Sequence, residues 1–182
     1  MAGIEREVTL DRRDVLLSGT LTLPDALGTP RTVALFVAGS GPTDRDGNGP
    51  ALGLRTDCLK QLAAALASGG VASLRYDKRG DGRSAAGPTD ESALRFEHFV
   101  DDAAEWARRL AVDPRFDRVA VLGHSEGALI AALCASHAPA VDHVLKLAGG
   151  DAASRAASYT HPERPLAPGL ADGILRFLAD LR

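Results

Sequence analysis

Apolar and polar positions follow two alternating periods along the chain, and these periods predict strands and helices in turn. Residues 4–10 alternate apolar with polar side chains and residues 15–23 follow after a short turn, which favours an antiparallel pair of strands. Short continuous apolar runs, such as residues 33–38, indicate strands buried on both faces. Six strands are expected, over residues 4–10, 15–23, 33–38, 71–76, 119–122 and 141–148.

Apolar positions three and four residues apart predict helices between these strands. The expected helices run from Thr56 to Gly69, from Asp90 or Ser92 to about Leu110, from Ser125 to about Ser136, and over residues 170–181. Strands that alternate with helices favour a mostly parallel sheet covered by helices on both faces. The sequence therefore predicts a three-layer α/β sandwich of about six strands, built as a single domain over residues 1–182.

Composition narrows the classes of function. Apolar residues are 45% of the chain and the net charge is −3, which supports a packed core and gives no basic footprint for nucleic acid or for a membrane surface. No apolar run reaches the ~18 residues of a membrane span, and the amino terminus has no apolar leader. Cys58 and Cys134 make no metal-ligand pattern and are expected as free thiols. We expect a cytoplasmic protein without a metal.

The segment Gly123-His124-Ser125-Glu126-Gly127 carries the strongest chemical signal. An apolar strand precedes it and an alanine-rich helix follows it, so the serine is expected on a sharp turn that lifts its hydroxyl above the sheet. The two glycines let strand and helix pass close together. The backbone N–H of Glu126 is expected at the helix N-terminus, where it faces a developing oxyanion. Ser125 is therefore the predicted nucleophile.

Four segments, in this order, resemble the α/β-hydrolase superfamily, in particular bacterial esterase-like hydrolases grouped with the serine aminopeptidase type. The segments are residues 16–24 with Ser-Gly-Thr-Leu, residues 37–48 with Val-Ala-Gly-Ser-Gly-Pro-Thr-Asp-Arg-Asp-Gly-Asn, residues 75–84 with Arg-Tyr-Asp-Lys-Arg-Gly-Asp-Gly-Arg-Ser, and residues 123–127. The resemblance implies a truncated α/β-hydrolase fold with no lid domain, a small ester or acyl substrate, and no cofactor.

The resemblance also assigns roles to two loops. It implies that the backbone N–H of Ser40 is the second oxyanion donor, beside that of Glu126. The glycines on both sides of Ser40 agree with this role, because they let backbone approach a substrate carbonyl closely. A simple surface loop over residues 39–49 stays open as the alternative. For Asp77 and Arg79 the resemblance implies structural roles, tying loops together beneath the site.

The triad base and acid are where this chain departs from the family pattern, whose order is Ser, then acid, then His. The segment beginning at Asp142 resembles the family's histidine segment, which implies His143 as the base. Only 18 positions separate it from Ser125, which leaves no room for a lid and an acid-bearing strand. A parallel strand over residues 141–148 also starts at the far end of the sheet, so His143 is expected roughly 15 Å from the serine.

Other residues compete for these roles. His161 is the rival base, since it follows the last strand on the correct side of the sheet. Asp142 adjoins His143, but neighbours on a strand point to opposite faces, so it is poorly placed to orient that ring. Asp151 is the candidate acid by position alone. The sequence leaves the acid unassigned and the choice between His143 and His161 open.

The function predicted from the sequence is that of a serine hydrolase cleaving a small carboxylic ester or thioester through an acyl-enzyme on Ser125. Two alternatives stay open. One is a catalytically inactive α/β-hydrolase remnant. The other is a hydrolase completed only by dimerisation, because the last strand would leave an exposed sheet edge that invites pairing with another chain.

Overall fold

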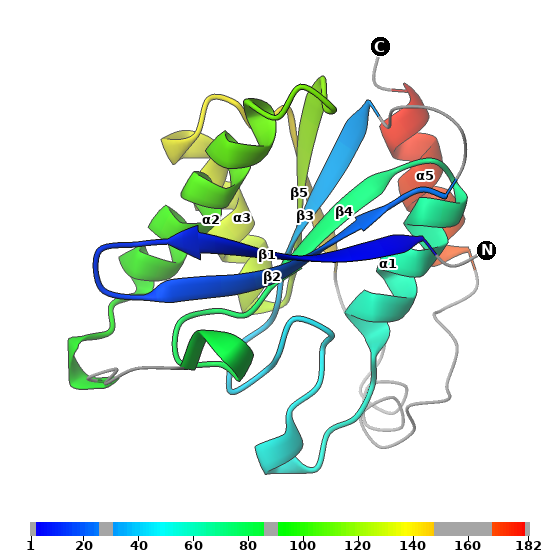
Figure 1. Cartoon of the computed structure of the whole chain (residues 1–182). Coiled ribbons are helices and arrows are strands. Elements are labelled where there is room, and N and C mark those ends of the chain that lie inside the picture. Colours follow the sequence, from blue (N-terminus) through cyan, green and yellow to red (C-terminus); the bar gives the residue numbers. More distant parts are fainter. Residues whose placement is uncertain (1–2, 26–30, 86–90, 148–168, 181–182) are drawn as a thin grey trace.

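The computed structural model describes residues 3–25, 31–85, 91–147 and 169–180 (Figure 1). Within these ranges six strands form one sheet in the order β1-β2-β4-β3-β5-β6. The strands are β1 (Ile4–Asp11), β2 (Leu16–Leu23), β3 (Thr32–Val37), β4 (Ala72–Tyr76), β5 (Arg118–His124) and β6 (His143–Leu147). β2 pairs antiparallel with both β1 and β4, and the other neighbours pair in parallel. The mostly parallel six-stranded sheet predicted from the sequence is confirmed.

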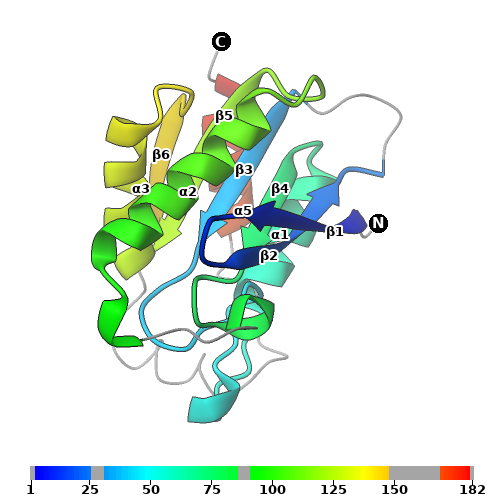
Figure 2. The same cartoon turned by 60° about the vertical axis from the view of Figure 1, so that its left-hand side comes forward.

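Helices cover both faces of this sheet (Figure 2). They are α1 (Cys58–Ser68), α2 (Phe96–Ala111), α3 (Glu126–His137) and α5 (Leu170–Asp180). α2 and α3 pack on one face around an apolar core that includes Trp106 and Ile130. α1 and α5 pack on the other face around a second core that includes Phe36 and Leu62. The layers are therefore helix, sheet and helix, as expected for a three-layer α/β sandwich.

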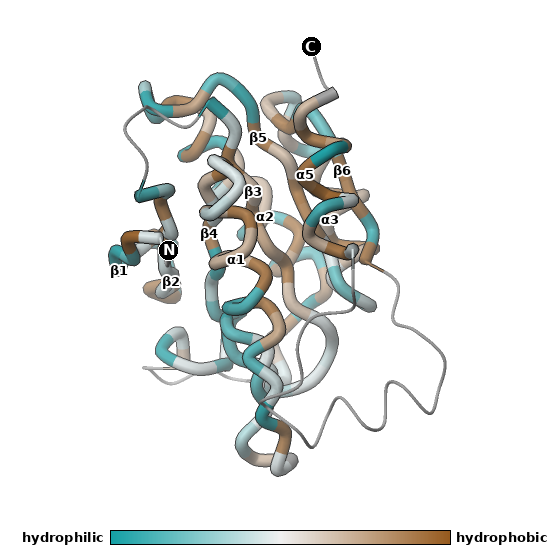
Figure 3. The backbone as a smooth tube through the Cα atoms, turned by 90° about the vertical axis from the view of Figure 1, so that its right-hand side faces the viewer, coloured by the Kyte–Doolittle hydropathy of each residue, from teal (hydrophilic) through white to brown (hydrophobic). Residues whose placement is uncertain are grey.

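The central strands are buried because helices cover both of their faces. All six residues of β3 and all five of β4 are buried. In Figure 3 the apolar colour runs along the central strands β3 and β5. The continuous apolar runs read from the sequence therefore correspond to the strands at the centre of the sheet.

Several element boundaries differ by one or more residues from those predicted, and two of these differences have a clear local cause. α2 begins at Phe96, because Arg95 has an extended backbone with φ −128° and ψ 150°, which ends helical geometry there. β6 begins at His143, because the N–H of Val141 is bonded to the carbonyl of Ala138 in a turn. Both differences arise from local hydrogen bonding and backbone geometry that hydrophobic periodicity does not record.

The carboxyl ends of the parallel strands lie at one edge of the sheet, at the lower end of Figure 1. The loops after β3 and β4 gather there, together with the turn between β5 and α3. Ligands of open α/β sheets bind at this edge, because the loops that follow the strands converge on it. This edge therefore holds the candidate site.

Candidate active site

Ser125 occupies a sharp turn between β5 and α3 and is exposed. Its backbone angles, φ 53° and ψ −120°, lie outside the regions that residues with a Cβ favour. Strained residues of this kind persist only where the surrounding structure holds them, and they cluster at functional sites. The strand, bend and helix expected from the sequence are present, with the serine at the carboxyl edge of the sheet.

Two glycines make this turn possible by letting backbone segments cross in contact. A Cβ added to Gly123 would overlap the carbonyl oxygen of Gly127. A Cβ added to Gly127 would overlap the carbonyl oxygens of Val37 and Ala38, where β3 ends. Because these obstacles are backbone atoms, they have little freedom to move aside. The start of α3 therefore sits directly against β5 and β3.

The loop after β3 lies beside the serine. A Cβ placed on Gly39 would be 3.4 Å from the Cβ of Ser125 and 3.2 Å from Nδ1 of His124. Ser40 follows and is exposed. Glu126 begins α3, and the first N–H groups of a helix have no acceptor within it. The structure thus brings Ser40, Glu126 and Ser125 to the same edge of the sheet.

Asp77 ties the loop after β3 to the loop after β4. Its buried carboxylate accepts hydrogen bonds from the backbone N–H of Arg45 at 2.7 Å and from the Arg45 guanidinium at 2.7 and 3.0 Å. It also accepts the backbone N–H of Arg83 at 2.9 Å. Arg45 reaches on to Glu7 and Thr20, on the first two strands. Asp77 therefore acts as a junction beneath the site.

Arg79 ties the loop after β4 to α2. It donates to both carboxylate oxygens of Asp102, at 2.5 and 2.9 Å, and to Asp14 at 2.5 Å. Asp102 is 1% exposed and also accepts a bond from Arg12 at 3.1 Å. Hydrogen bonding to Asp102 raises the pKa of the Arg79 guanidinium. These contacts agree with the structural roles that the sequence resemblance implied for Asp77 and Arg79.

Lys78, between these two residues, is a site residue that the sequence analysis missed. Its side chain is 4% exposed, and its ammonium group donates a 2.6 Å hydrogen bond to the carbonyl oxygen of Gly39. A carboxylate oxygen of Glu126 lies 3.5 Å from Nζ, and the ring of Phe99 lies 5.5 Å from it. No local sequence pattern marks this contact, because a lysine in a polar loop is usually solvated.

His124 and Asp81 are titratable groups near this edge. Burial lowers the pKa of the His124 imidazole, so the ring that packs beside Gly39 is neutral near pH 7. Burial also raises the pKa of the Asp81 carboxyl to about 6, and nearby negative charges, Asp77 first among them, add to this effect against the attraction of Lys78. Asp81 therefore changes charge within the range in which enzymes are commonly assayed.

Asp81→Asn is expected to stabilise the fold at pH 8 and to leave it unchanged near pH 4. The folded-state pKa of Asp81 is about 6, above its ordinary value of 3.8, so the folded state binds this proton more tightly than the unfolded state does. That stabilisation is complete below pH 4 and is lost as the pH rises through 6. Asparagine keeps the neutral form at every pH. Thermal unfolding midpoints at both pH values measure the difference.

The matched control for this variant is Asp113→Asn. Hydrogen bonding from Arg115 lowers the pKa of the Asp113 carboxyl, so the charged form stabilises the fold and its neutralisation is expected to lower the midpoint at pH 8. A midpoint change for Asp81→Asn that is equal at the two pH values would contradict the assigned pKa.

His143 is not brought to Ser125. In the sheet register His143 lies opposite Ala120, and Ser125 follows Ala120 by five residues on the neighbouring strand. At about 3.3 Å per residue this is roughly 16 Å, more than an imidazole side chain spans. The His143 ring instead meets the ring of Phe177 edge-on, with centroids 6.0 Å apart. Its position early in β6 is the cause, because parallel strands align the beginning of β6 with the beginning of β5.

The remaining candidates for the triad base and acid are Asp142, His161 and Asp151. Asp142 accepts the backbone N–H of Val119 at 2.7 Å, so its carboxylate fixes the pairing of β5 and β6 at the amino end of the sheet. His161 and Asp151 lie outside the described residues. In the register Leu147 lies opposite His124, so β6 ends at the level of the serine turn.

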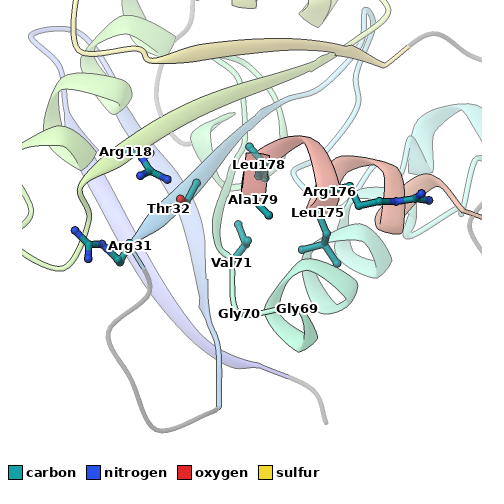
Figure 4. A pocket seen from close by; sticks show the side chains of 10 residues that line it. All are labelled: Arg31, Thr32, Gly69, Gly70, Val71, Arg118, Leu175, Arg176, Leu178 and Ala179. Carbon is teal, nitrogen blue, oxygen red and sulfur yellow. The ribbon is translucent and has the colours of Figure 1, made fainter. Parts of the chain in front are cut away.

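Two hollows are present in the described surface. The larger, of about 540 Å³, is at the amino ends of the strands (Figure 4). Thr32, which begins β3, and Arg118, which begins β5, line it, so it lies at the opposite edge of the sheet. A smaller polar hollow of about 240 Å³ sits over the junction of Arg45 and Asp77. Neither hollow is lined by the serine.

The described ranges contain neither a metal-binding cluster nor a membrane-spanning helix. There, no three or more His, Cys, Asp or Glu side chains are grouped closely enough to hold a metal ion. Among the described helices, none combines the length and the apolar character needed to cross a membrane. Cys58 and Cys134 are both free thiols, as the sequence predicted.

A sequence profile for the family described as serine aminopeptidase, S33, matches residues 52–172. The chain belongs to this family. The matched stretch contains the loop with Lys78, all of β5, and the serine turn. Membership of the S33 family and the α/β-hydrolase fold therefore agree with the resemblance seen in the sequence.

Known proteins similar to this S33 family member include esterases. Esterase EstD of Thermotoga maritima is 34% identical over 128 residues, a match that covers 69% of this chain and 28% of that protein. The α/β hydrolase GrgF from Penicillium sp. sh18 has a TM-score of 0.62 at 18% identity, covering 79% of this chain and 45% of the other. The Pyrococcus furiosus esterase Pf2001 has a TM-score of 0.55 at 21% identity, covering 78% and 51%.

The two structural similarities establish the α/β-hydrolase fold. The chain spans about half or less of the length of these three proteins. The profile match shows membership of the serine aminopeptidase family, and the name esterase belongs to the similar proteins.

Proposed function

We propose that this chain is a serine hydrolase that cleaves a small carboxylic ester or thioester. The observation that carries the proposal is the strained, exposed Ser125 between a buried strand and a helix N-terminus. Strain at a residue is costly, at about 1–3 kcal/mol, and is retained where function uses it. Serine in this turn is the geometry of a nucleophile in α/β-hydrolases.

In the proposed reaction the Ser125 hydroxyl attacks the substrate carbonyl and its proton passes to a base. The backbone N–H groups of Ser40 and Glu126 receive the negative charge that develops on the carbonyl oxygen. Protonation of the alcohol or thiol leaving group gives an acyl-serine, and water then releases the acid and restores the hydroxyl. Residues of this chain alone provide the nucleophile and both donors.

A short acyl group suits the site. Ser125 is exposed, and it does not line either of the two hollows described above. A long acyl chain gains affinity only by leaving water for an apolar channel. Selectivity for short acyl chains is therefore part of the proposal.

Turnover of chromogenic substrates by the purified chain tests this proposal. We expect p-nitrophenyl acetate and butyrate to be hydrolysed faster than the octanoate, and amino-acid p-nitroanilides to be hydrolysed slowly or not at all. Rates equal to those of buffer for every substrate would support the inactive remnant instead. Cleavage of the anilides in preference to the esters would replace the esterase proposal with a peptidase one.

The same chromogenic assay, applied to histidine variants, identifies the base of the proposed reaction. His143 is held away from Ser125 by the register of β6. We therefore propose His161 as the base, since the chain leaves β6 at Leu147, beside the serine turn. We expect His161→Gln to lose turnover and His143→Gln to keep it. The reverse result would show that β6 shifts its register during the reaction.

A second copy of this chain is the proposed partner, bound along β6. Among the described residues β6 pairs on one side only, with β5. On the helices beside it, Leu129 and Leu133 of α3 and Phe177 of α5 are 55%, 38% and 42% exposed. The opposite edge of the sheet, β1, is instead protected by charged and exposed Glu5, Arg6 and Glu7.

Antiparallel pairing of two β6 strands is compatible with their charges. A two-fold axis at Leu145 places Lys146 of one copy opposite Val144 of the other, so no like charges meet. We expect light scattering to give twice the 19.0 kDa chain mass at micromolar concentration. A mass of one chain at all concentrations would rule out this partner.

A further inference from the structure

The buried ammonium group of Lys78 has an unusual set of partners. A lysine charge loses hydration on burial, and this loss is usually offset by a close carboxylate. Here the shortest bond, at 2.6 Å, goes to the backbone carbonyl of Gly39, and the carboxylate of Glu126 is farther away at 3.5 Å. The ring of Phe99 lies over the charge at 5.5 Å. The strongest contact of this lysine therefore acts on the loop backbone.

That contact fixes the direction of a neighbouring N–H group. The carbonyl of Gly39 and the N–H of Ser40 belong to one planar peptide, and in a trans peptide they point in opposite directions. Holding the carbonyl toward Lys78 therefore aims the Ser40 N–H to the other side. This peptide is adjacent to the nucleophile turn, since a Cβ on Gly39 would be 3.4 Å from that of Ser125.

Within the described residues, the bond from Lys78 is the side-chain hydrogen bond given for this peptide. Gly39 precedes it, and Gly41, with φ 81°, follows Ser40. Glycine allows wide backbone rotation, so a peptide that follows the Cα of a glycine has more than one accessible orientation. A charge-assisted hydrogen bond is about twice as strong as a neutral one, and Lys78 supplies it to a single orientation.

We propose that Lys78 is a positioning residue for the oxyanion site: it holds the Gly39–Ser40 peptide so that its N–H faces the carbonyl under attack at Ser125. This inference rests on the proposed hydrolase function. The ammonium charge also polarises the peptide it binds, which strengthens the N–H as a donor. Lys78 touches neither substrate nor nucleophile in this role and acts through the backbone.

Lys78→Met tests the proposal, because methionine keeps the aliphatic volume and removes the charge and the donors. We expect kcat for p-nitrophenyl acetate, per active site titrated, to fall by about 10²-fold, the effect of losing one oxyanion donor. KM is expected to change less than about threefold, since the donor acts mainly on the transition state. The inhibition constant of phenylboronic acid, which forms a tetrahedral adduct, is expected to rise with the loss of kcat.

Two further variants separate positioning from simple structural support. Lys78→Arg keeps a cation near the Gly39 carbonyl and is expected to recover part of kcat, whereas the exposed lysine variant Lys60→Met is expected to match the unmodified chain. A purely structural lysine would lower the unfolding midpoint and the titratable fraction while leaving kcat per site unchanged. Lys78→Met with unchanged kcat and boronate inhibition would overturn the proposal.

A structural readout keeps this test separate from the hydrolase proposal. In a crystal structure of Lys78→Met the Gly39–Ser40 peptide is expected to rotate, so that the Gly39 carbonyl leaves its present direction. An unrotated peptide overturns the role of Lys78 even if the chain hydrolyses esters. A chain that hydrolyses no ester overturns the proposed function, and the peptide orientation still decides whether Lys78 fixes the loop.

Discussion

Ser125→Ala is expected to lower kcat for ester hydrolysis by at least about 10⁴-fold, because it removes the only atom proposed to form the acyl bond. The fold is expected to be unchanged, since the side chain is exposed and alanine meets the same backbone strain at φ 53°. Steady-state kinetics and thermal unfolding measure the two quantities. Retained turnover by this variant would show that Ser125 is not the nucleophile.

Ser125→Gly is the companion variant, and its stability reports on the strain itself. The angles φ 53° and ψ −120° are nearly the mirror image of ordinary extended backbone, a conformation that glycine adopts freely. We expect this variant to be inactive and more stable than the unmodified chain by about 1 kcal/mol, after the larger chain entropy of glycine is subtracted. A less stable Ser125→Gly would show that the turn holds no strain for glycine to relieve.

Asp102→Ala is expected to destabilise the fold by about 3–5 kcal/mol, the usual effect of removing one partner of a buried ion pair. Asp102 is 1% exposed and accepts bonds from Arg79 and Arg12, so its loss leaves the buried Arg79 guanidinium with the exposed Asp14 as its remaining carboxylate partner. Urea unfolding measures the difference. Because Arg79 also anchors the loop that carries Lys78, a loss of kcat is expected alongside the loss of stability.

Glu105→Ala is the control for this prediction. Glu105 lies on the same helix and is 36% exposed, with ion pairs to Arg12 and Arg108. Ion pairs near the surface contribute little to the free energy of unfolding. We therefore expect this free energy to change by no more than about 0.5 kcal/mol. Equal destabilisation by the two alanine variants would contradict the assignment of Asp102 as the buried anchor.

Much of the fold was predictable because the sheet is buried on both faces. Continuous apolar runs such as residues 33–38 have few places to lie except the centre of such a sheet, and β3 is found there. The serine turn was predictable for a related reason. Gly123 and Gly127 are needed where backbone segments are in contact, and these two glycines can be recognised in the sequence.

Long-range polar contacts could not be predicted from the sequence. Lys78 reaches a carbonyl 39 residues away, and no local pattern marks a lysine that is buried in this manner. The position of His143 depends on the register between two strands. A motif resemblance identifies the residue, whereas the register sets its distance from Ser125. The start of α2 at Phe96 has a local cause instead, namely the extended backbone of Arg95.

The central claim is that Ser125 is a reactive nucleophile in the folded chain, and covalent labelling tests it most directly. The purified protein is to be treated with a fluorophosphonate, digested, and mapped by mass spectrometry. We expect one phosphonyl adduct, on the peptide that contains Ser125, and none when the protein is unfolded before treatment. Folded protein that stays unlabelled, or that carries its adduct on another serine, would contradict the account.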